Sequence, residues 1–217
     1  MTLSNDTFKL AASYTIGSYL LPGDPIENLS KIIDSNVKVN ISVCKDIIAG
    51  IKDRTYDIGL IETPLFDDEL VYKPWMENEM VFCSKTQLPT DLNIDLLKNY
   101  QLICREKSSL TRELIGDFFK EFGISHKDFK SIQEINNATA LIQGVKWSKV
   151  SQENPTLTVV SKLAIEDEVE RQELFISRFK THAMNHPYYI VYLKEKSKDS
   201  IINNIVNYLT SLQKDIK

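Results

Sequence analysis

Apolar positions along the chain follow two spacings, and segments with the two spacings alternate. Val37–Val43 (VKVNISV) alternates strictly between apolar and polar residues, which predicts a strand. Asp57–Ile61 (DIGLI) is a short apolar run of the kind found in strands that are buried on both faces. Because strand-like and helix-like segments follow each other in turn, we expect an α/β fold with a mainly parallel sheet covered by helices.

The same two spacings locate the remaining strands and helices. Further strands are expected at Phe8–Ser13, Glu69–Lys73, Met80–Cys83, Gln101–Cys104, Phe129–Ile135, Leu157–Val160, Leu174–Phe179 and Tyr188–Leu193. A helix is expected from about Thr15 to Ile33, with Pro22 and Pro25 disturbing its middle. Other helices are expected where apolar residues repeat at helical spacing: Ile47, Ile48 and Ile51; Leu110, Leu114, Ile115, Phe118 and Phe122; Leu141 and Val145; and Ile201, Ile205, Leu209 and Leu212.

Hydroxyl and amide side chains follow several of these strands, where the next helix is expected to start. The residues are Ser13, Thr15, Ser109, Thr111, Asn136 and Asn137. Any one of them, taken alone, is best interpreted as a simple helix cap. Open α/β sheets bind ligands at helix starts beside the carboxyl ends of parallel strands, so as a group these residues predict a shared binding site.

Composition and charge exclude several classes of protein. The 217 residues are 42% hydrophobic and 26% charged, which is ordinary for a globular domain. The net charge of −4 does not support nonspecific electrostatic binding of nucleic acid, and no apolar run is long enough to span a membrane. The first residues lack the pattern of a signal peptide, and the odd set of Cys44, Cys83 and Cys104 has no CxxC spacing. A cytoplasmic location with free thiols is therefore expected.

The motifs of common enzyme classes are missing from the sequence. It contains no G-x-G-x-x-G, GK[ST] or G-x-S-x-G motif. His126, His182 and His186 have no metal-ligand spacing, and the last two are expected in a surface loop. Glu62 ends a buried strand. Three roles fit this position: a general base, a helix cap, and a contact to an amine of a ligand. We favour the contact to a ligand. We therefore expect no catalytic residue, no metal and no cofactor.

Several segments occur in an order and at a spacing that are known from one family. Leu10–Pro22 (LAASYTIGSYLLP) combines a strand, a hydroxyl-bearing turn and the pattern IG-x-YLLP. It is followed at the right distances by Val39–Ile51, Asp57–Glu62 (DIGLIE), Met80–Ser84, Arg105–Arg112 (REKSSLTR) and Leu157–Ile165 (LTVVSKLAI). Each motif is weak alone, but together they cover nearly the whole chain and resemble the effector-binding domain of LysR-type transcriptional regulators.

The resemblance implies a two-lobed α/β fold similar to type-2 periplasmic binding proteins. Two mixed sheets flanked by helices would be joined by two crossover strands, with the crossings near Phe82 and Ile190. Lobe I would comprise residues 1–82 and 190–217, and lobe II residues 83–189. The final helix would return to pack on lobe I.

The resemblance further implies that the chain binds a small molecule in the interlobe cleft and thereby controls transcription, without catalysis. Carried over onto this sequence, the effector contacts are Ser13, Thr15, Glu62, Ser109, Thr111, Asn136 and Asn137. Helix starts attract an anionic group, whereas an ionised Glu62 repels one, so a neutral or zwitterionic effector is expected. The alternatives are a solute-binding protein of a transporter and an enzyme on the same fold with Glu62 as its base.

The family's helix-turn-helix and linker helix have no counterpart in this sequence. We therefore expect a truncated chain with Met1 added, which reaches operator DNA only through the missing N-terminal domain. The resemblance also implies a homodimer or higher homo-oligomer in which the first helix packs on the partner. That helix has more apolar positions than one buried face requires: Tyr19, Leu20, Ile26, Leu29 and Ile33.

The sequence departs from the family pattern at three places. Leu110 replaces the second glycine of the family's GSG turn, and the polar loop Trp147–Thr156 replaces its GLG loop. Peroxide-sensing members carry a redox cysteine where this chain has Ser109. Cys104, in the preceding strand, is expected to be a small buried apolar residue, so no thiol switch is expected.

Overall fold

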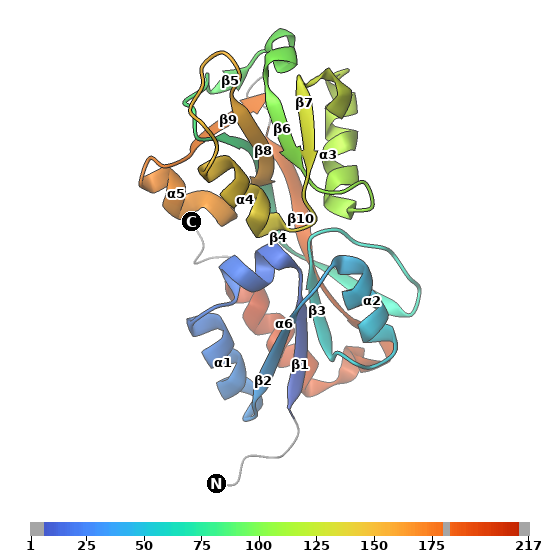
Figure 1. Cartoon of the computed structure of the whole chain (residues 1–217). Helices are drawn as coiled ribbons and strands as arrows, with labels where there is room; N and C mark the ends of the chain where they lie inside the picture. Colours follow the sequence, from blue (N-terminus) through green and yellow to red (C-terminus); the bar gives the residue numbers. More distant parts are fainter. Residues whose placement is uncertain (1–6, 180–182, 213–217) are drawn as a thin grey trace. The chain divides into compact units, whose positions relative to one another are not determined.

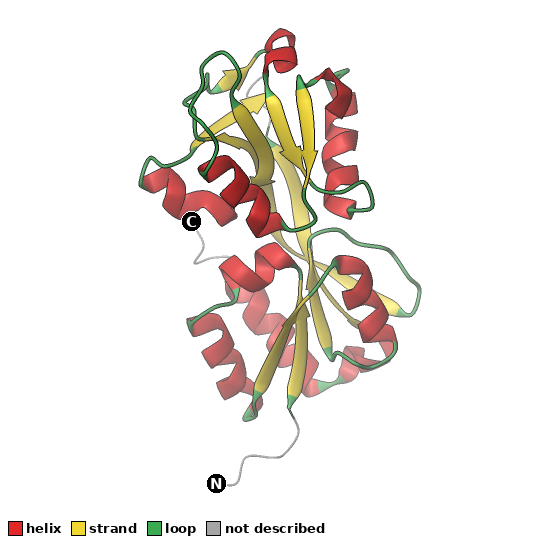
Figure 2. Ribbon diagram, viewed as in Figure 1, coloured by secondary structure: helices red, strands yellow, loops and turns green. Residues whose placement is uncertain are grey.

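The computed structural model describes residues 7–179 and 183–212 (Figure 1). The chain divides into two compact units, Met1–Glu77 with Pro187–Lys217 (unit 1) and Asn78–His186 (unit 2). Two strands have residues in both units, β4 (Leu70–Ser84) and β10 (Met184–Leu193). The predicted α/β class is confirmed, and in each unit helices flank the strands (Figure 2). Within the two described ranges, no helix has the length and apolar character needed to cross a membrane.

The strands of unit 1 are arranged so that three carboxyl ends meet at one edge. The strands are β1 (Phe8–Ala12), β2 (Val37–Ile41) and β3 (Ile58–Ile61). They follow the order β2-β1-β3-β10, with β1 parallel to both of its neighbours and β10 antiparallel to β3. Leu10 lies opposite both Val39 and Ile58. Because parallel strands point the same way, Ser13 after β1 and Glu62 after β3 lie at the same edge of the sheet.

Helices pack on the unit 1 sheet through the apolar positions that periodicity identifies. The helical segments are a short π-helix (Ile16–Leu20), α1 (Asp24–Ile33), α2 (Cys44–Lys52), a 3₁₀ turn (Lys194–Lys198) and α6 (Ser200–Leu212). α2 contacts β3 and β1 with Ile47, Ile48 and Ile51 buried, as predicted, and α1 packs against α6. Gly59 permits this approach, because a Cβ atom there would lie 2.6 Å from Ile51 Cδ1.

Unit 2 is a second α/β layer structure built around a mixed sheet. Its strand order is β4-β8-β6-β7, and β9 pairs with β4 and with the short β5. The strands are β5 (Asp91–Leu92), β6 (Gln101–Cys104), β7 (Ser131–Glu134), β8 (Thr156–Ser161) and β9 (Phe175–Phe179). The helical segments are Ile94–Asn99, α3 (Leu110–Glu121), His126–Asp128, α4 (Ala138–Lys146), Lys162–Ile165 and α5 (Glu166–Glu170). β6 is parallel to both β7 and β8, whereas β4 is antiparallel to β8.

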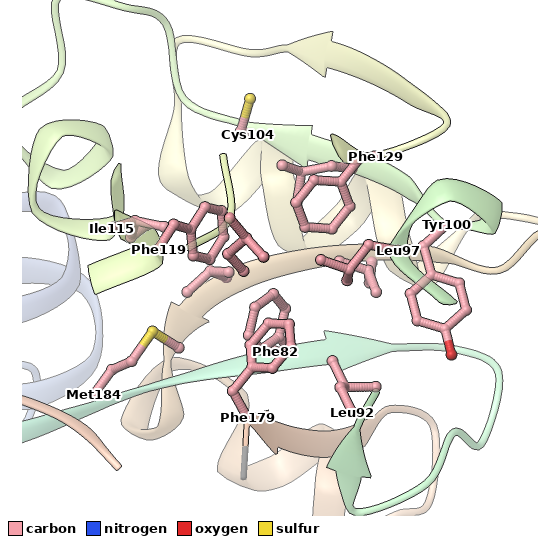
Figure 3. Packing of buried hydrophobic residues seen from close by; sticks show 14 of the residues in the cluster. Phe82, Leu92, Leu97, Tyr100, Cys104, Ile115, Phe119, Phe129, Phe179 and Met184 are labelled. Carbon is pink, nitrogen blue, oxygen red and sulfur yellow. The ribbon is translucent and has the colours of Figure 1, made fainter. Parts of the chain in front are cut away.

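Alternate residues of β4, β6 and β8 enter two separate apolar clusters, as the period of two along a strand requires. Met80 and Phe82 of β4 belong to the cluster that includes α3, and Val81 and Cys83 belong to the cluster that includes α4. Figure 3 shows the first cluster, in which the Phe82 and Phe119 rings are stacked with centroids 5.9 Å apart. Burial on both faces explains why the runs Met80–Cys83 and Leu102–Cys104 are apolar.

Two predicted segments have a different structure. Glu69–Lys73 and Met80–Cys83 are parts of one strand, β4, because the polar positions between them do not interrupt the extended backbone, and Pro74 is exposed there. The long helix expected from Thr15 is broken instead at residues 21–23, where Gly23 has a φ of 82°. Pro25 lies in the first turn of α1, where proline is favoured because the first amides of a helix have no partner within it.

The final helix buries a slightly different face from the one expected. Ile205 and Leu209 are buried as predicted, but Ile201 is 45% exposed and Ile202 takes its place in the core. Val206 is buried as well. The period of a helix does not distinguish between adjacent apolar residues at its first turn, so packing against α1 and the sheet decided the face.

Candidate functional site

A polar cluster in unit 1, formed by Ser13, Thr15 and Glu62, lies at the carboxyl edge of its parallel strands. Ser13 Oγ donates a hydrogen bond of 2.8 Å to Glu62 Oε1, and the backbone N–H of Thr15 donates one of 3.1 Å to the same oxygen. All three residues are buried, with exposed fractions of 3%, 7% and 9%. The structure thus brings together three of the predicted site residues, although Glu62 is 49 positions from Ser13.

Backbone conformation shows what Thr15 does in this cluster. Its φ and ψ of −64° and −49° are helical, and its side chain makes no capping hydrogen bond to the short π-helix that follows. A residue whose hydroxyl only capped the helix would accept a bond from an amide of the first turn. Capping is therefore not the role of the Thr15 hydroxyl in this structure.

Cys44, the first residue of α2, is a neighbour of the cluster that sequence reasoning missed. Burial and the negative charge of Glu62 raise the pKa of the Cys44 thiol to about 11, against a smaller opposite effect of the backbone N–H groups of Thr63 and Glu62. The thiol is therefore uncharged at neutral pH. The available signal was topological: β2 and β3 both flank β1, so the residues that follow β2 reach the same sheet edge as Glu62.

The predicted site residues of unit 2 follow two neighbouring parallel strands, β6 and β7. Ser109 precedes α3, is 7% exposed and makes no side-chain capping bond, while Thr111 is half-buried. Asn137 caps α4 as predicted, because its side-chain oxygen accepts a 2.9 Å hydrogen bond from the Ala140 N–H. Asn136 is exposed. The α3 start thus offers backbone donors and the Ser109 hydroxyl.

Ion pairs hold the turn between β6 and α3. Arg112 Nη1 donates to the backbone oxygen of Arg105 at 2.7 Å and to Glu134 Oε1 at 2.6 Å. Arg105 is 8% exposed and pairs with the adjacent Glu106 through two hydrogen bonds of 3.0 and 3.1 Å. Charged residues of the REKSSLTR segment therefore stabilise the turn that presents Ser109.

The three cysteines are free, as expected, and all three are buried. Cys104 is 8% exposed beside this turn, and burial raises its pKa, which confirms the interpretation as a small buried residue. Across the described ranges, no group of three or more His, Cys, Asp or Glu side chains is placed to hold a metal ion.

The surface-loop prediction is wrong for His186. It lies in β10, is 9% exposed, and lines an apolar pocket with Met80, Met184 and Phe118. Burial lowers the pKa of His186 to about 4, so the ring is uncharged at neutral pH. The segment was misread because β10 starts at Met184, three residues before Pro187, a residue that usually marks a loop. His182 lies outside the described residues.

Comparison with known proteins identifies the family of the chain. Residues 2–213 match the family model described as the LysR substrate binding domain. The chain is 30% identical over 173 residues to the HTH-type transcriptional regulator CysL of Bacillus subtilis (strain 168), covering 77% of this chain and 54% of that protein. It is 25% identical over 170 residues to the HTH-type transcriptional regulator YeiE of Escherichia coli (strain K12), covering 76% and 55%. The chain thus spans about half the length of these relatives.

Solved structures with the same fold include two regulatory domains in complex with small molecules. The effector-binding domain of QuiR in complex with shikimate aligns with a TM-score of 0.76 at 16% identity, covering 98% of this chain and 99% of that one. The regulatory domain of Synechocystis PCC6803 CcmR in complex with 2-PG aligns with a TM-score of 0.78 at 20% identity, covering 97% and 98%. These structural similarities show the fold, and the match to the family model shows the family. The chain belongs to the LysR substrate-binding domain family.

Proposed function

We propose that this chain is the effector-sensing domain of a LysR-type transcriptional regulator, which binds a small molecule and so controls transcription. Its relatives CysL and YeiE carry the name of HTH-type transcriptional regulators, which supports an operator-binding domain elsewhere in the full-length protein. The ligands in the QuiR and CcmR structures support a small-molecule effector, because the same fold binds one in each. The alternative, a transporter's solute-binding protein, receives no support from these relatives.

The observation that carries this proposal is the buried polar cluster Ser13–Thr15–Glu62 at the carboxyl edge of the unit 1 sheet. Ligands of open α/β sheets bind at this edge. Ser109 and Thr111, together with Asn136 and Asn137, are the proposed effector contacts of unit 2. Their groups belong to turns that follow β6 and β7, which are the corresponding positions of that sheet.

Binding without turnover is the chemistry that this cluster favours. Glu62 is the general base that an enzyme with this site would need, yet its Oε1 already accepts two hydrogen bonds from the protein. We propose that those bonds serve to hold the turn after β1. We therefore propose that the effector leaves chemically unchanged.

We also propose a cytoplasmic homodimer or higher homo-oligomer. The apolar residues expected on the first helix lie in the π-helix and in α1. Of these, Leu29 belongs to the core at 1% exposure, but Tyr19 is 38% exposed. Leu20, Ile26 and Ile33 are half-buried. An apolar surface of this kind is consistent with a partner that covers it.

A thermal-shift screen of the chain against a panel of common metabolites tests the function. We expect a small set of compounds to raise the melting temperature, since binding to the folded state stabilises it by mass action. Each compound is then incubated with stoichiometric protein and analysed by mass spectrometry, and it should be recovered intact. Conversion of a hit to a product would indicate an enzyme in place of a sensing domain. The absence of any hit would contradict the proposed sensing function.

A further inference from the structure

We propose that the effector contacts unit 1 through a hydrogen-bond donor, such as a protonated amine or an amide N–H, and not through an anionic group. This inference rests on the proposed function, because it concerns the ligand that the unit 1 cluster binds. It follows from the direction of each hydrogen bond at that cluster.

The donors of the cluster are largely used within the protein. Ser13 has one hydroxyl proton, which it donates to Glu62 Oε1, so Ser13 Oγ can only accept further bonds. The backbone N–H of Thr15 is used by the same oxygen, and the N–H of Ser13 donates to Leu60 O at 2.9 Å. Gly17 N–H donates to the carbonyl of Ser13 at 2.8 Å. The Thr15 hydroxyl remains able to donate, and it can accept equally well.

Acceptors are in surplus at the same place. Among the residues that the structure describes, no protein donor bonds to Glu62 Oε2, while Oε1 accepts two bonds. A carboxylate has room for about four hydrogen bonds. The hydroxyl of the next residue, Thr63, is buried without a partner in the described part of the chain, and it can either accept or donate. A ligand group that donates hydrogen bonds would satisfy Glu62 Oε2, and an anion would not.

Charge favours the same class of ligand. Glu62 is 9% exposed, and none of the ion pairs formed within residues 7–179 and 183–212 includes it. Cys44 beside it is uncharged, so no thiolate adds to or competes with the carboxylate. A cationic or neutral donor is attracted to this oxygen, whereas a carboxylate or sulfate is repelled.

Matched pairs of probes test the inference on the wild-type chain. Each L-amino acid, amine and amide is compared with the 2-oxo or carboxylic acid of the same carbon skeleton, and inorganic sulfate is added as a simple anion. Melting shifts select binders, and calorimetry measures their dissociation constants. We expect the donor-bearing member of a binding pair to bind at least tenfold more tightly than its acid counterpart.

The variant Glu62→Gln tests whether the charge and the hydrogen-bond direction of Glu62 select the ligand, because it leaves the side-chain shape nearly unchanged. The amide oxygen still accepts from Ser13 and Thr15, while an NH₂ group replaces Oε2, so an acceptor becomes a donor and the charge is lost. Donor-bearing ligands should bind at least tenfold more weakly, and the preference over the matched acids should disappear or reverse. Glu69→Gln is the control: it removes the same charge from unit 1 at a side chain that is 67% exposed.

The outcomes are distinguishable. If the wild type binds the acids or sulfate as tightly as the donors, and Glu62→Gln leaves the affinities unchanged, the inference is overturned while the sensing function stands. If no class of probe binds, the sensing function fails, and the inference fails with it. If Glu62→Gln does not fold, the wild-type comparison of matched pairs still decides, because it needs no variant.

Discussion

Glu62 has a structural role and a proposed binding role, divided between its two carboxylate oxygens. Oε1 accepts from Ser13 and Thr15, which fixes the turn after β1. Oε2 is the oxygen that the proposed effector would use. A single residue at the end of a buried strand thus positions two hydroxyl-bearing neighbours and sets the polarity of the site.

Thr15→Val tests the effector contact at the level of one hydroxyl group. The change keeps the side-chain shape, and because the hydroxyl makes no capping bond, the free energy of unfolding should change little. Affinity for the tightest compound of the metabolite screen should fall about tenfold, which corresponds to roughly 1.4 kcal/mol. Titration calorimetry and melting curves measure the two effects. A lowered melting temperature with unchanged affinity would show that Thr15 is purely structural.

His186 should make the protein sensitive to mild acid. Its pKa is lowered to about 4 in the folded chain, below the ordinary value of 6.5, so the unfolded chain binds a proton that the folded chain does not. The free energy of unfolding is therefore highest above pH 6.5, and it decreases by up to roughly 3 kcal/mol as the pH falls toward 4.

The variant His186→Phe removes this titration while a ring still fills the apolar pocket. Urea unfolding at several pH values between 7 and 4 should give a smaller loss of stability for the variant than for the wild type. Other acidic groups titrate equally in both proteins, so they cancel in the comparison. Parallel pH profiles would contradict the assignment.

At the level of the elements, the close contact of α2 with β3 makes Gly59 sensitive to substitution. A Cβ atom at Gly59 would lie 2.6 Å from Ile51 Cδ1 and 2.7 Å from Ile47 Cγ2, so these side chains must move. Gly59→Ala should destabilise the protein by about 1–3 kcal/mol, as overpacked cores do.

Gly116→Ala is the matched control in α3. The nearest atom to a Cβ there is His126 Cε1 at 3.7 Å, which is an ordinary contact. Alanine is favoured over glycine inside a helix, so this variant should gain up to about 1 kcal/mol. Denaturant unfolding should show a lower free energy of unfolding for Gly59→Ala and a higher one for Gly116→Ala. Equal effects of the two variants would contradict the close packing proposed at Gly59.

At the level of the whole molecule, we predict that the chain forms a homodimer in solution. The partner would cover the exposed Tyr19 and the half-buried Leu20, Ile26 and Ile33 of the π-helix and α1. Sedimentation velocity at tens of micromolar should show a species of twice the 24.9 kDa chain mass. The variant Tyr19→Asp, which places a charge in that surface, should shift the equilibrium toward monomer. Monomer alone for the wild type would contradict this prediction.

The sequence by itself determined the α/β class, the order of most elements and the family. The resemblance to the LysR family also placed Ser13, Thr15 and Glu62 in one site, and the structure brings them together at the edge where parallel strands end. Periodicity is a local property, and it suffices wherever a strand or helix buries one face regularly, as α2 does with Ile47, Ile48 and Ile51.

Only the tertiary structure decided the continuity of β4, the burial of His186 and the direction of the hydrogen bonds at Glu62. These features depend on partners far away in the sequence: Met80 of β4 pairs with Ser161, and Ser13 donates to a carboxylate 49 residues away. Hydrogen-bond direction and burial arise from such long-range contacts, and a local pattern of apolar and polar residues does not encode them. For that reason the residues of the unit 1 site were predictable from the sequence, whereas the surplus of acceptors there was not.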